Sequence, residues 1–175
     1  MLVSRVWTRD DSWCYGLAED EEKLLWFITF DRRAKEAHLK CYNPEKEEFV
    51  KEDISLKEEV GDRRRESKCR YLTFSKGKLY ISDLGLDKVY ILDPNNFESN
   101  RKFGSSGAGD GQFNEPAGVA VDDVGNILVA DYKNNRLSLY DKKRKWIENV
   151  KDRQVIKFNN PFLFGYLFSI LFYIE

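Results

Sequence analysis

Short apolar runs separated by polar turn residues make up much of the chain. GVAVD, ILVAD and RLSLYD, between residues 118 and 141, alternate in character and are separated by Gly, Asp and Asn. A two-residue alternation is typical of a half-buried strand, and these separators are typical of hairpin turns. The pattern therefore predicts short antiparallel β-strands joined by tight turns.

The strand pattern repeats along the chain. A gap-free shift of 48 residues places Gly77–Asp93 on Gly125–Asp141. Apolar residues then meet apolar residues, Asp83 meets Asp131, and the basic residue that opens the last run meets another basic residue. Agreement at this many positions in one register indicates an internal repeat.

A third, weaker copy precedes these two. The segments Leu24–Phe30 and His38–Pro44 resemble the last two strands of the repeat. Thr29 stands where the later copies have aspartate, and the connecting turn is longer. Terminal modules of a repeat array are often atypical in this way. Modules of roughly 45 residues with three or four strands each are typical of β-propeller blades, so we expect about three blades.

One acidic segment does not follow the strand pattern. PEKEEFVKEDISLKEEV, over residues 44–60, is rich in glutamate and lysine. Two interpretations are open, a helix or a long charged connection between modules, and we expect the connection.

The small and acidic residues of the repeat are explained by turn chemistry. Glycine allows a positive φ or a close approach of two backbones, and an aspartate at a strand end accepts hydrogen bonds from turn amides. A basic residue follows each strand-ending aspartate closely enough to pair with it. We therefore assign a structural role in turns, and no catalytic or metal-binding role, to Gly77, Asp83, Pro116, Gly118, Gly125 and Asp131.

One full repeat resembles a known family. KFGSSGAGDGQFNEPAGVAVDDVGNILVADYKNNRLSLYD (Lys102–Asp141) is similar to the NHL repeat, whose pattern runs roughly fG..G...G.F..P.GVAVD..G.i.VAD..NnRi..fd. Arg70–Gly104 also resembles it well, and the first module only faintly. The resemblance to NHL-repeat proteins, TRIM-NHL-like proteins among them, implies an all-β fold. We expect a partial NHL-type β-propeller, with blades of three to four antiparallel strands in an open arc rather than a closed ring.

The resemblance also implies a domain organisation. We expect a degenerate first blade with a charged insertion over residues 1–60 and a second NHL-like blade over 61–104. A third blade and the start of the next follow over 105–160, and an apolar tail over 161–175. The family's ring has about six blades, so we expect a fragment. Two copies that complete a ring, or a chain that folds poorly, are the alternatives.

The apolar tail has three interpretations. PFLFGYLFSILFYI is shorter than the roughly 20 residues that a membrane-spanning helix needs. A buried strand, a tail anchor and residues foreign to the domain are the alternatives, and we favour the last. A membrane partner is expected only if the tail is genuine.

Composition narrows the class of function. The formal net charge is only -1, so there is no overall attraction to nucleic acid or anionic membranes. Three widely spaced cysteines and one histidine form no CxxC or HxxxH pair, so we expect no metal and no cofactor. Reduced thiols favour a cytoplasmic setting. We expect no DNA partner and no enzymatic activity, because no catalytic constellation is evident.

The family resemblance implies a binding function. We expect a non-catalytic scaffold that presents propeller loops to a protein partner, as the substrate-recruiting part of a ubiquitin-ligase-type protein. The alternative is a single-stranded RNA-binding module in post-transcriptional regulation, with one loop of the third blade at its binding face. In that loop Tyr132 stacks on a base, Lys133 and Arg136 meet phosphate, and Asn134 or Asn135 reads a base edge.

The loop at the same position in the preceding blade favours the protein partner. Leu84–Asp87 carries no basic residue and no aromatic ring. Binding along an RNA strand needs both kinds of residue on successive blades. RNA is therefore the second hypothesis.

Overall fold

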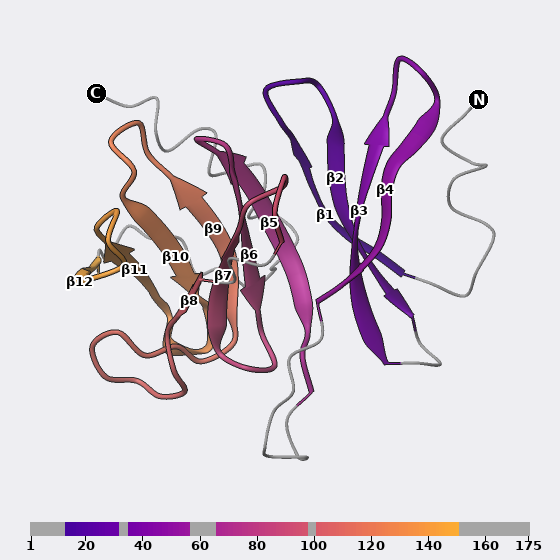
Figure 1. The fold of residues 1–175 in the computed structure, drawn as a ribbon. Coiled ribbons are helices and arrows are strands. Elements are labelled where there is room, and N and C mark those ends of the chain that lie inside the picture. The colour runs from indigo at the N-terminus through magenta and orange to yellow at the C-terminus, as the bar shows by residue number, and fades with distance from the viewer. Residues whose placement is uncertain (1–12, 32–34, 57–65, 98–100, 151–175) are drawn as a thin grey trace.

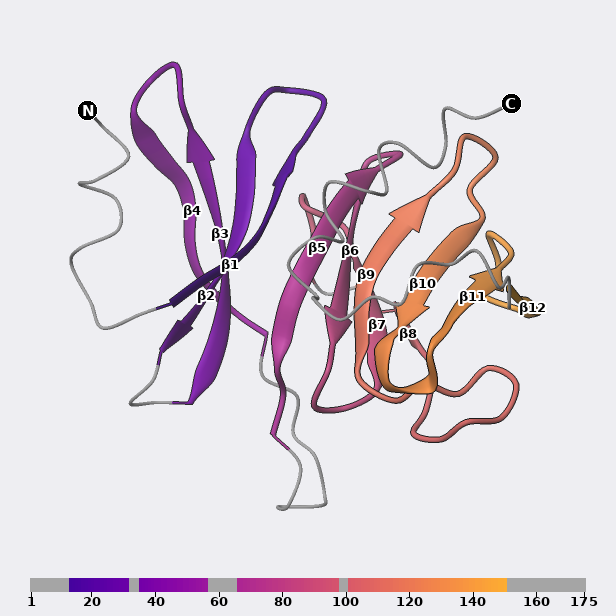
Figure 2. The same cartoon turned by 180° about the vertical axis from the view of Figure 1, so that it is seen from behind.

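A computed structural model of the chain describes residues 13–31, 35–56, 66–97 and 101–150 (Figure 1). These segments form three four-stranded antiparallel sheets, each built from strands that are consecutive in the chain. Figures 1 and 2 show the sheets side by side in chain order, with the second between the first and the third. The predicted all-β fold with propeller-type blades in an open arc is confirmed.

Each sheet is one blade. Blade 1 consists of β1 (Trp13–Glu19), β2 (Leu25–Asp31), β3 (Glu36–Asn43) and β4 (Glu48–Ser55). Blade 2 consists of β5 (Cys69–Ser75), β6 (Lys78–Asp83), β7 (Lys88–Leu92) and β8 (Arg101–Phe103). Blade 3 consists of β9 (Pro116–Val121), β10 (Ile127–Asp131), β11 (Arg136–Tyr140) and β12 (Trp146–Val150), with a 3₁₀ turn, η1 (Tyr132–Asn134), between β10 and β11.

The internal repeat corresponds to the central hairpin of each of the last two blades. In blade 2, Asp83 at the end of β6 lies opposite Lys88 at the start of β7. In blade 3, Asp131 lies opposite Arg136 in the same way. The aspartate that recurs every 48 residues therefore marks the same corner of consecutive blades.

The expected charged connection over residues 44–60 is wrong for its middle part. Glu48–Ser55 is strand β4, which pairs with β3 along the edge of blade 1. The ring centroids of Tyr42 and Phe49 lie 5.4 Å apart, and Ile54 packs on the core between blades 1 and 2. Two irregularities in the β3–β4 register disturb the two-residue alternation, so the segment does not read as a strand. Residues 57–60 lie outside the described residues.

Blade 2 buries both of its faces. Leu79 and Ile81 of β6 point into the core shared with blade 1. Tyr80 of β6 and Val89 of β7 point into the core shared with blade 3. Side chains alternate across a strand, so a strand covered on both sides needs apolar residues at nearly every position. Inter-blade packing therefore explains why β6 and β7 read as continuous apolar runs.

Two of the three glycines assigned to turns lie in them. Gly77 and Gly125 have φ angles of 68° and 95° in the turns before β6 and β10, a conformation that side chains disfavour. Gly118 differs, because it lies inside strand β9. Its neighbourhood carries a register shift between β9 and β10, and an irregular strand is another common place for glycine.

The apolar tail over residues 161–175 lies outside the described residues, so its three interpretations stay predictions. Within the described part of the chain, no helix is long and apolar enough to cross a membrane.

Packing between blades should dominate stability. Leu79 is fully buried between blades 1 and 2, so Leu79→Ala should lower the free energy of unfolding by about 2–5 kcal/mol through lost burial and a cavity. Val124→Ala, at a residue that is 67% exposed, should change it by less than about 0.5 kcal/mol. Urea unfolding followed by tryptophan fluorescence measures both. Equal midpoints for the two variants would contradict a shared inter-blade core.

Candidate functional site

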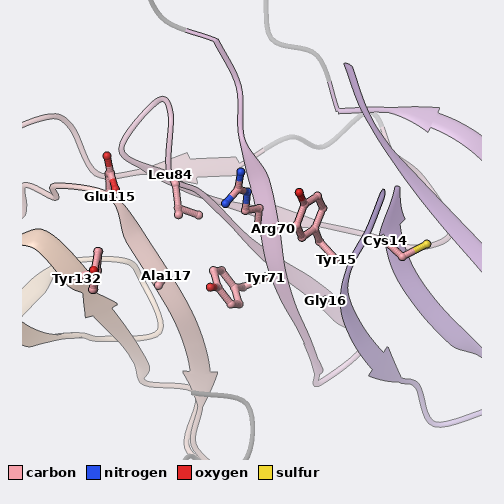
Figure 3. Close-up of a pocket in the computed structure, with 9 residues that line it drawn as sticks. All are labelled: Cys14, Tyr15, Gly16, Arg70, Tyr71, Leu84, Glu115, Ala117 and Tyr132. Carbon is pink, nitrogen blue, oxygen red and sulfur yellow. The ribbon is translucent and has the colours of Figure 1, made fainter. Parts of the chain in front are cut away.

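A pocket of about 290 Å³ opens across the first strands of all three blades (Figure 3). These strands, β1, β5 and β9, contact one another in order along the chain. Its lining residues come from each blade: Cys14, Tyr15, Gly16, Arg70, Tyr71, Leu84, Glu115, Ala117 and Tyr132. The pocket is therefore a product of blade packing, and no single repeat contains it.

Each of the three first strands is irregular at the pocket. The pairing register shifts between Tyr15 and Leu17 in β1, and between Cys69 and Tyr71 in β5. In β9 the register shifts between Pro116 and Val119, where three steps along β9 match two steps along β10. An extra residue in a strand bends it and re-aims a side chain. The irregularities place Gly16 and Arg70 at the pocket.

Gly16 allows blades 1 and 2 to approach closely. A Cβ atom at this position would lie 2.6 Å from Leu72 Cδ2 and 2.9 Å from the carbonyl oxygen of Arg70. Its φ of 54° is also unfavourable for other residues. A side chain at Gly16 would therefore push β1 away from β5 and change the pocket.

Arg70 is the cation of the pocket lining, and it has no ion pair with any described residue. Its guanidinium carbon lies 4.9 Å from the centroid of the Tyr15 ring, a cation–π contact between two blades. Within the described residues, no carboxylate lies at ion-pairing distance from this guanidinium. Arg70 is half-buried, so its charge is only partly solvated.

Two lysines at this end of the blades are paired with glutamates, and a third, the exposed Lys68, has no ion pair among the described residues. Lys133 Nζ lies 2.6 Å from Glu115 Oε1, and this hydrogen bond raises the pKa of the lysine. Lys35 Nζ lies 3.4 Å from Glu66 Oε1. The Glu115 backbone N–H in turn donates to Asp87 Oδ1 at 2.8 Å. These contacts therefore neutralise Lys133 and Lys35 at the rim.

Burial suppresses the ionisation of the pocket's weak acids. It raises the pKa of Tyr71, with nearby Arg70 opposing the effect and Tyr132 adding to it. It also raises the pKa of the Cys14 thiol to about 11, with Lys40 opposing. Both groups are therefore neutral at physiological pH, and the pocket offers hydroxyl and thiol groups on aromatic and apolar walls.

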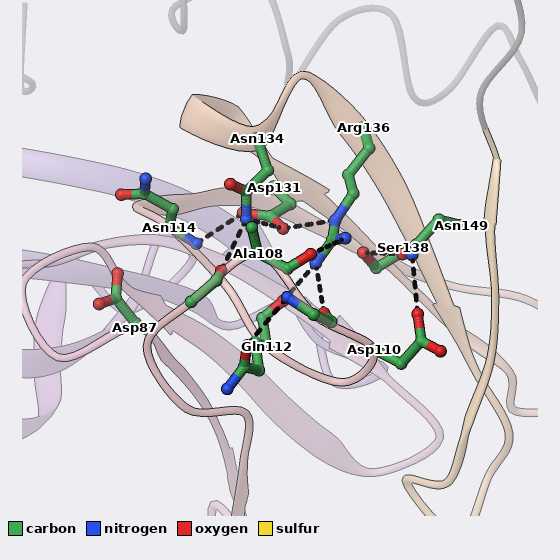
Figure 4. Close-up of polar contacts among 12 residues, drawn as sticks. Asp87, Ala108, Asp110, Gln112, Asn114, Asp131, Asn134, Arg136, Ser138 and Asn149 are labelled. Atoms are coloured by element: carbon green, nitrogen blue, oxygen red, sulfur yellow. Dashed lines mark hydrogen bonds and ion pairs between the residues drawn. The ribbon is translucent and has the colours of Figure 1, made fainter.

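Arg136, one of the residues expected at a phosphate, is buried and bonded within the protein (Figure 4). Its Nε donates to Asp131 Oδ2 at 2.8 Å, and both side chains are at most 5% exposed. Its two terminal nitrogens donate to the main-chain carbonyls of Ala108, Gly109 and Gln112 at 2.7–2.9 Å. Arg136 therefore holds the loop before β9 against the β10–β11 hairpin.

Of the other residues between β10 and β11, some bond within the protein and some lie at its surface. Asn134 Nδ2 donates to the Gly107 carbonyl and to Asp131 Oδ2, both at 2.8 Å. Asn135 is exposed, with a left-handed φ of 49° that closes the turn. Tyr132 lines the pocket and Lys133 pairs at its rim. Among the five residues expected to bind a ligand, these two are the ones at the pocket.

The strand-ending aspartates are both fully buried. Asp83 Oδ1 accepts the backbone N–H groups of Lys68, Gly85 and Leu86 at 2.8–3.0 Å. Asp131 Oδ1 accepts the N–H of Asn114 at 2.7 Å. These carboxylates tie the start of their own blade to its central hairpin. In the described residues, no group of three or more histidine, cysteine or acidic residues is arranged to hold a metal ion.

Sequence reasoning missed the pocket residues of blades 1 and 2, namely Tyr15, Arg70 and Tyr71. The available signal was an aromatic residue near the start of the first strand in each of these blades. That signal gives no reason to place the residues together, because they meet only through packing between blades.

The buried Asp131–Arg136 ion pair should contribute more to the free energy of unfolding than the aspartate of an exposed turn. Asp131→Ala leaves the Arg136 guanidinium buried without its carboxylate, so the free energy of unfolding should fall by about 3–5 kcal/mol. Asp122→Ala, which removes a similar amide acceptor from a more exposed turn, should cost about 1 kcal/mol. Urea unfolding of both variants measures the difference. Equal losses would show that the Asp131–Arg136 pair is not a structural clamp.

Cys14 should react slowly while the chain is folded. A pKa of about 11 instead of 9 leaves roughly 100-fold less thiolate at pH 8, and the thiolate is the reactive form. Iodoacetamide labelling, followed by mass spectrometry of the peptide that contains Cys14, measures the rate. The rate should keep rising with pH up to about 11, and urea-unfolded chain should react at the ordinary rate. A plateau near pH 9 in the folded chain would contradict the burial of this thiol.

Comparison with known proteins identifies the repeat. The family model for the NHL repeat matches residues 113–139. The chain is 49% identical over 45 residues to the B-box type zinc finger protein ncl-1 of Caenorhabditis elegans, which covers 26% of this chain and 5% of the relative. It is 47% identical over 45 residues to the protein brain tumor of Drosophila melanogaster, covering 26% and 4%. It is 35% identical over 77 residues to mouse NHL repeat-containing protein 3, covering 37% and 22%.

Solved structures show the same fold. A virginiamycin B lyase from Staphylococcus aureus superposes with a TM-score of 0.56 at 14% identity, over 84% of this chain and 44% of that one. A chain of a nidogen–laminin complex superposes with a TM-score of 0.57 at 16% identity, over 81% and 48%. The chain thus matches less than a quarter of the length of these relatives and about half of these propeller structures. The chain contains an NHL repeat over residues 113–139, and its described residues form three blades of a β-propeller fold.

Proposed function

We propose that the pocket and its rim, here called the pocket face, form a non-catalytic surface that binds a protein partner. The observation that carries the proposal is the composition of the pocket: three tyrosines and one arginine on the first strands and loops of three blades. Tyrosine and arginine are enriched at the centres of protein interfaces, where an apolar body and a polar tip serve together.

The charge of the pocket face favours a protein over single-stranded RNA. An RNA strand needs a succession of unopposed cations along its phosphates. Lys133 and Lys35 are each paired with a glutamate, and Arg136 is buried. A surface on which these cations are already paired or buried, and which carries aromatic groups, suits a folded or extended polypeptide better.

The positions of the acidic and thiol groups support a non-catalytic role. The carboxylates of Asp83 and Asp131 are occupied by turn amides and by Arg136. The Cys14 thiol is held protonated by burial. The likeness to a lyase concerns the fold, because the identity is 14%.

The names of the relatives support a scaffold role for this surface. NHL-repeat proteins, TRIM-NHL members among them, serve as protein- or RNA-binding scaffolds, and one relative is named as a B-box type zinc finger protein. We propose that this chain supplies the partner-recruiting surface of a ubiquitin-ligase-type protein. A cytoplasmic setting is part of the proposal, and the three free cysteines support it.

Peptide display tests the pocket face. A random dodecapeptide library is selected on the immobilised wild-type chain, and enriched peptides are measured by fluorescence anisotropy. Tyr132→Ala removes a pocket wall and should weaken their binding by about tenfold, the loss typical of an interface residue worth more than 1 kcal/mol. Tyr42→Ala, a matched change in blade 1 outside the pocket lining, should leave it unchanged.

A degenerate single-stranded RNA pool is titrated in parallel at several salt concentrations. Micromolar binding of RNA with a steep salt slope, together with peptides that ignore Tyr132→Ala, would overturn the protein-partner proposal in favour of RNA.

A further inference from the structure

We propose that the pocket binds a carboxylate of an acidic peptide segment in its partner, and that Arg70 is the residue that recognises it. This inference rests on the proposed function and narrows it to one class of ligand. Three features carry the argument: the contact that positions the guanidinium, the charge balance of the pocket, and the limited extent of its positive charge.

The guanidinium of Arg70 is held in place before any ligand arrives. Arg70 lies where the register of β5 shifts, and its guanidinium lies over the Tyr15 ring of the neighbouring blade at 4.9 Å. Figure 3 shows Arg70 between Leu84 and Tyr15. A cation–π contact uses none of the guanidinium N–H groups as hydrogen-bond donors to another side chain, so they are left for a ligand. A pre-organised fork of this kind suits the two oxygens of a carboxylate.

The positive charge of Arg70 is not compensated within the pocket lining. Glu115, the carboxylate of the pocket lining, is held at 2.6 Å by Lys133 and so forms a neutral pair. Within the described residues, no carboxylate pairs with Arg70. Arg70, Glu115 and Lys133 together therefore carry one net positive charge, that of the half-buried Arg70 side chain, where an anion from a partner replaces lost hydration.

The extent of positive charge selects a peptide carboxylate over a polyanion. A phosphate backbone gains affinity from several contacts in a row, but Lys133 and Lys35 are already paired, and Lys68 is the exposed lysine beside β5 that has no ion pair in the described residues. Around Arg70 the walls are the apolar side chains of Leu84 and Ala117 and the rings of Tyr71 and Tyr132. A single acidic residue beside an apolar residue matches one cation in an apolar, aromatic pocket.

A double-mutant cycle between protein and peptide tests the assignment. The probes are the dodecapeptides selected on the wild-type chain, each resynthesised with Asn or Gln in place of every Asp or Glu in turn and with an amidated C-terminus. One such replacement should weaken binding to the wild-type chain by about tenfold, the loss typical of a charge-assisted hydrogen bond. On Arg70→Met the acidic and amide forms should bind equally.

Two further variants keep the test decisive. Arg101→Met, at an exposed arginine of β8, is the matched control and should keep the tenfold preference. Arg70→Lys keeps the charge but loses the planar fork, so the preference should fall to roughly threefold. Circular dichroism confirms that each variant is folded. If Arg70→Met does not fold, the acid preference of Arg70→Lys is the test, and an unchanged tenfold preference would contradict the assignment.

The outcomes separate this inference from the function on which it rests. Selected peptides that lose affinity on Tyr132→Ala but bind equally as acid and amide would overturn the carboxylate assignment and leave the pocket face as the binding surface. An acid preference that survives Arg70→Met would place the recognition residue elsewhere. Failure of every peptide to bind, with binding of the RNA pool, would overturn both proposals.

Discussion

The buried carboxylate at the end of the second strand is the interaction on which the rest of blades 2 and 3 depends. Asp83 and Asp131 have no exposed surface, and a buried carboxylate is stable only when its oxygens are hydrogen-bonded. Both meet this need in the same way, by accepting the N–H of a residue just before the first strand of their own blade, Lys68 or Asn114. One side chain thereby ties three parts of a blade together.

The pocket is built on these ties. Arg70 and Tyr71 follow Lys68 within three residues, and Ala117 follows Asn114 within three. The same carboxylates also organise the loops that carry the remaining lining residues, since Asp83 accepts amides beside Leu84 and Asp131 binds the side chain next to Lys133. Turn chemistry and ligand binding are thus separate tasks of adjacent residues. The aspartates set the geometry, and their neighbours face the pocket.

The sequence was sufficient to predict the repeat because hairpins are local structures. The 48-residue shift aligns β6 and β7 with β10 and β11, and turn chemistry explains Asp83 and Asp131 as they lie in the structure. Strand β4 was missed because its register breaks, which removes the alternation that identifies a strand. Gly118 was placed in a turn because glycine is commoner there than inside an irregular strand.

The pocket could not be predicted from the sequence, because its residues meet only through packing. Tyr15 and Arg70 belong to different blades and are in contact across β1 and β5. Arg136 shows the opposite case. Its sequence position beside an exposed loop favours a surface role, but three carbonyl groups from a segment more than 20 residues earlier bury it. Contacts between distant segments thus decide which basic residue is structural and which is available to a ligand.

The role of the buried Asp131 carboxylate can be measured directly through the amide that it accepts. Amide hydrogen exchange, followed by NMR, compares the N–H of Asn114 with that of Val124. Both donate to an aspartate Oδ1, but Asp131 is fully buried and Asp122 lies in a surface turn. We expect the Asn114 amide to exchange orders of magnitude more slowly, and to lose this protection in Asp131→Asn. Exchange at equal rates in the wild-type chain would contradict the central role of the buried aspartates.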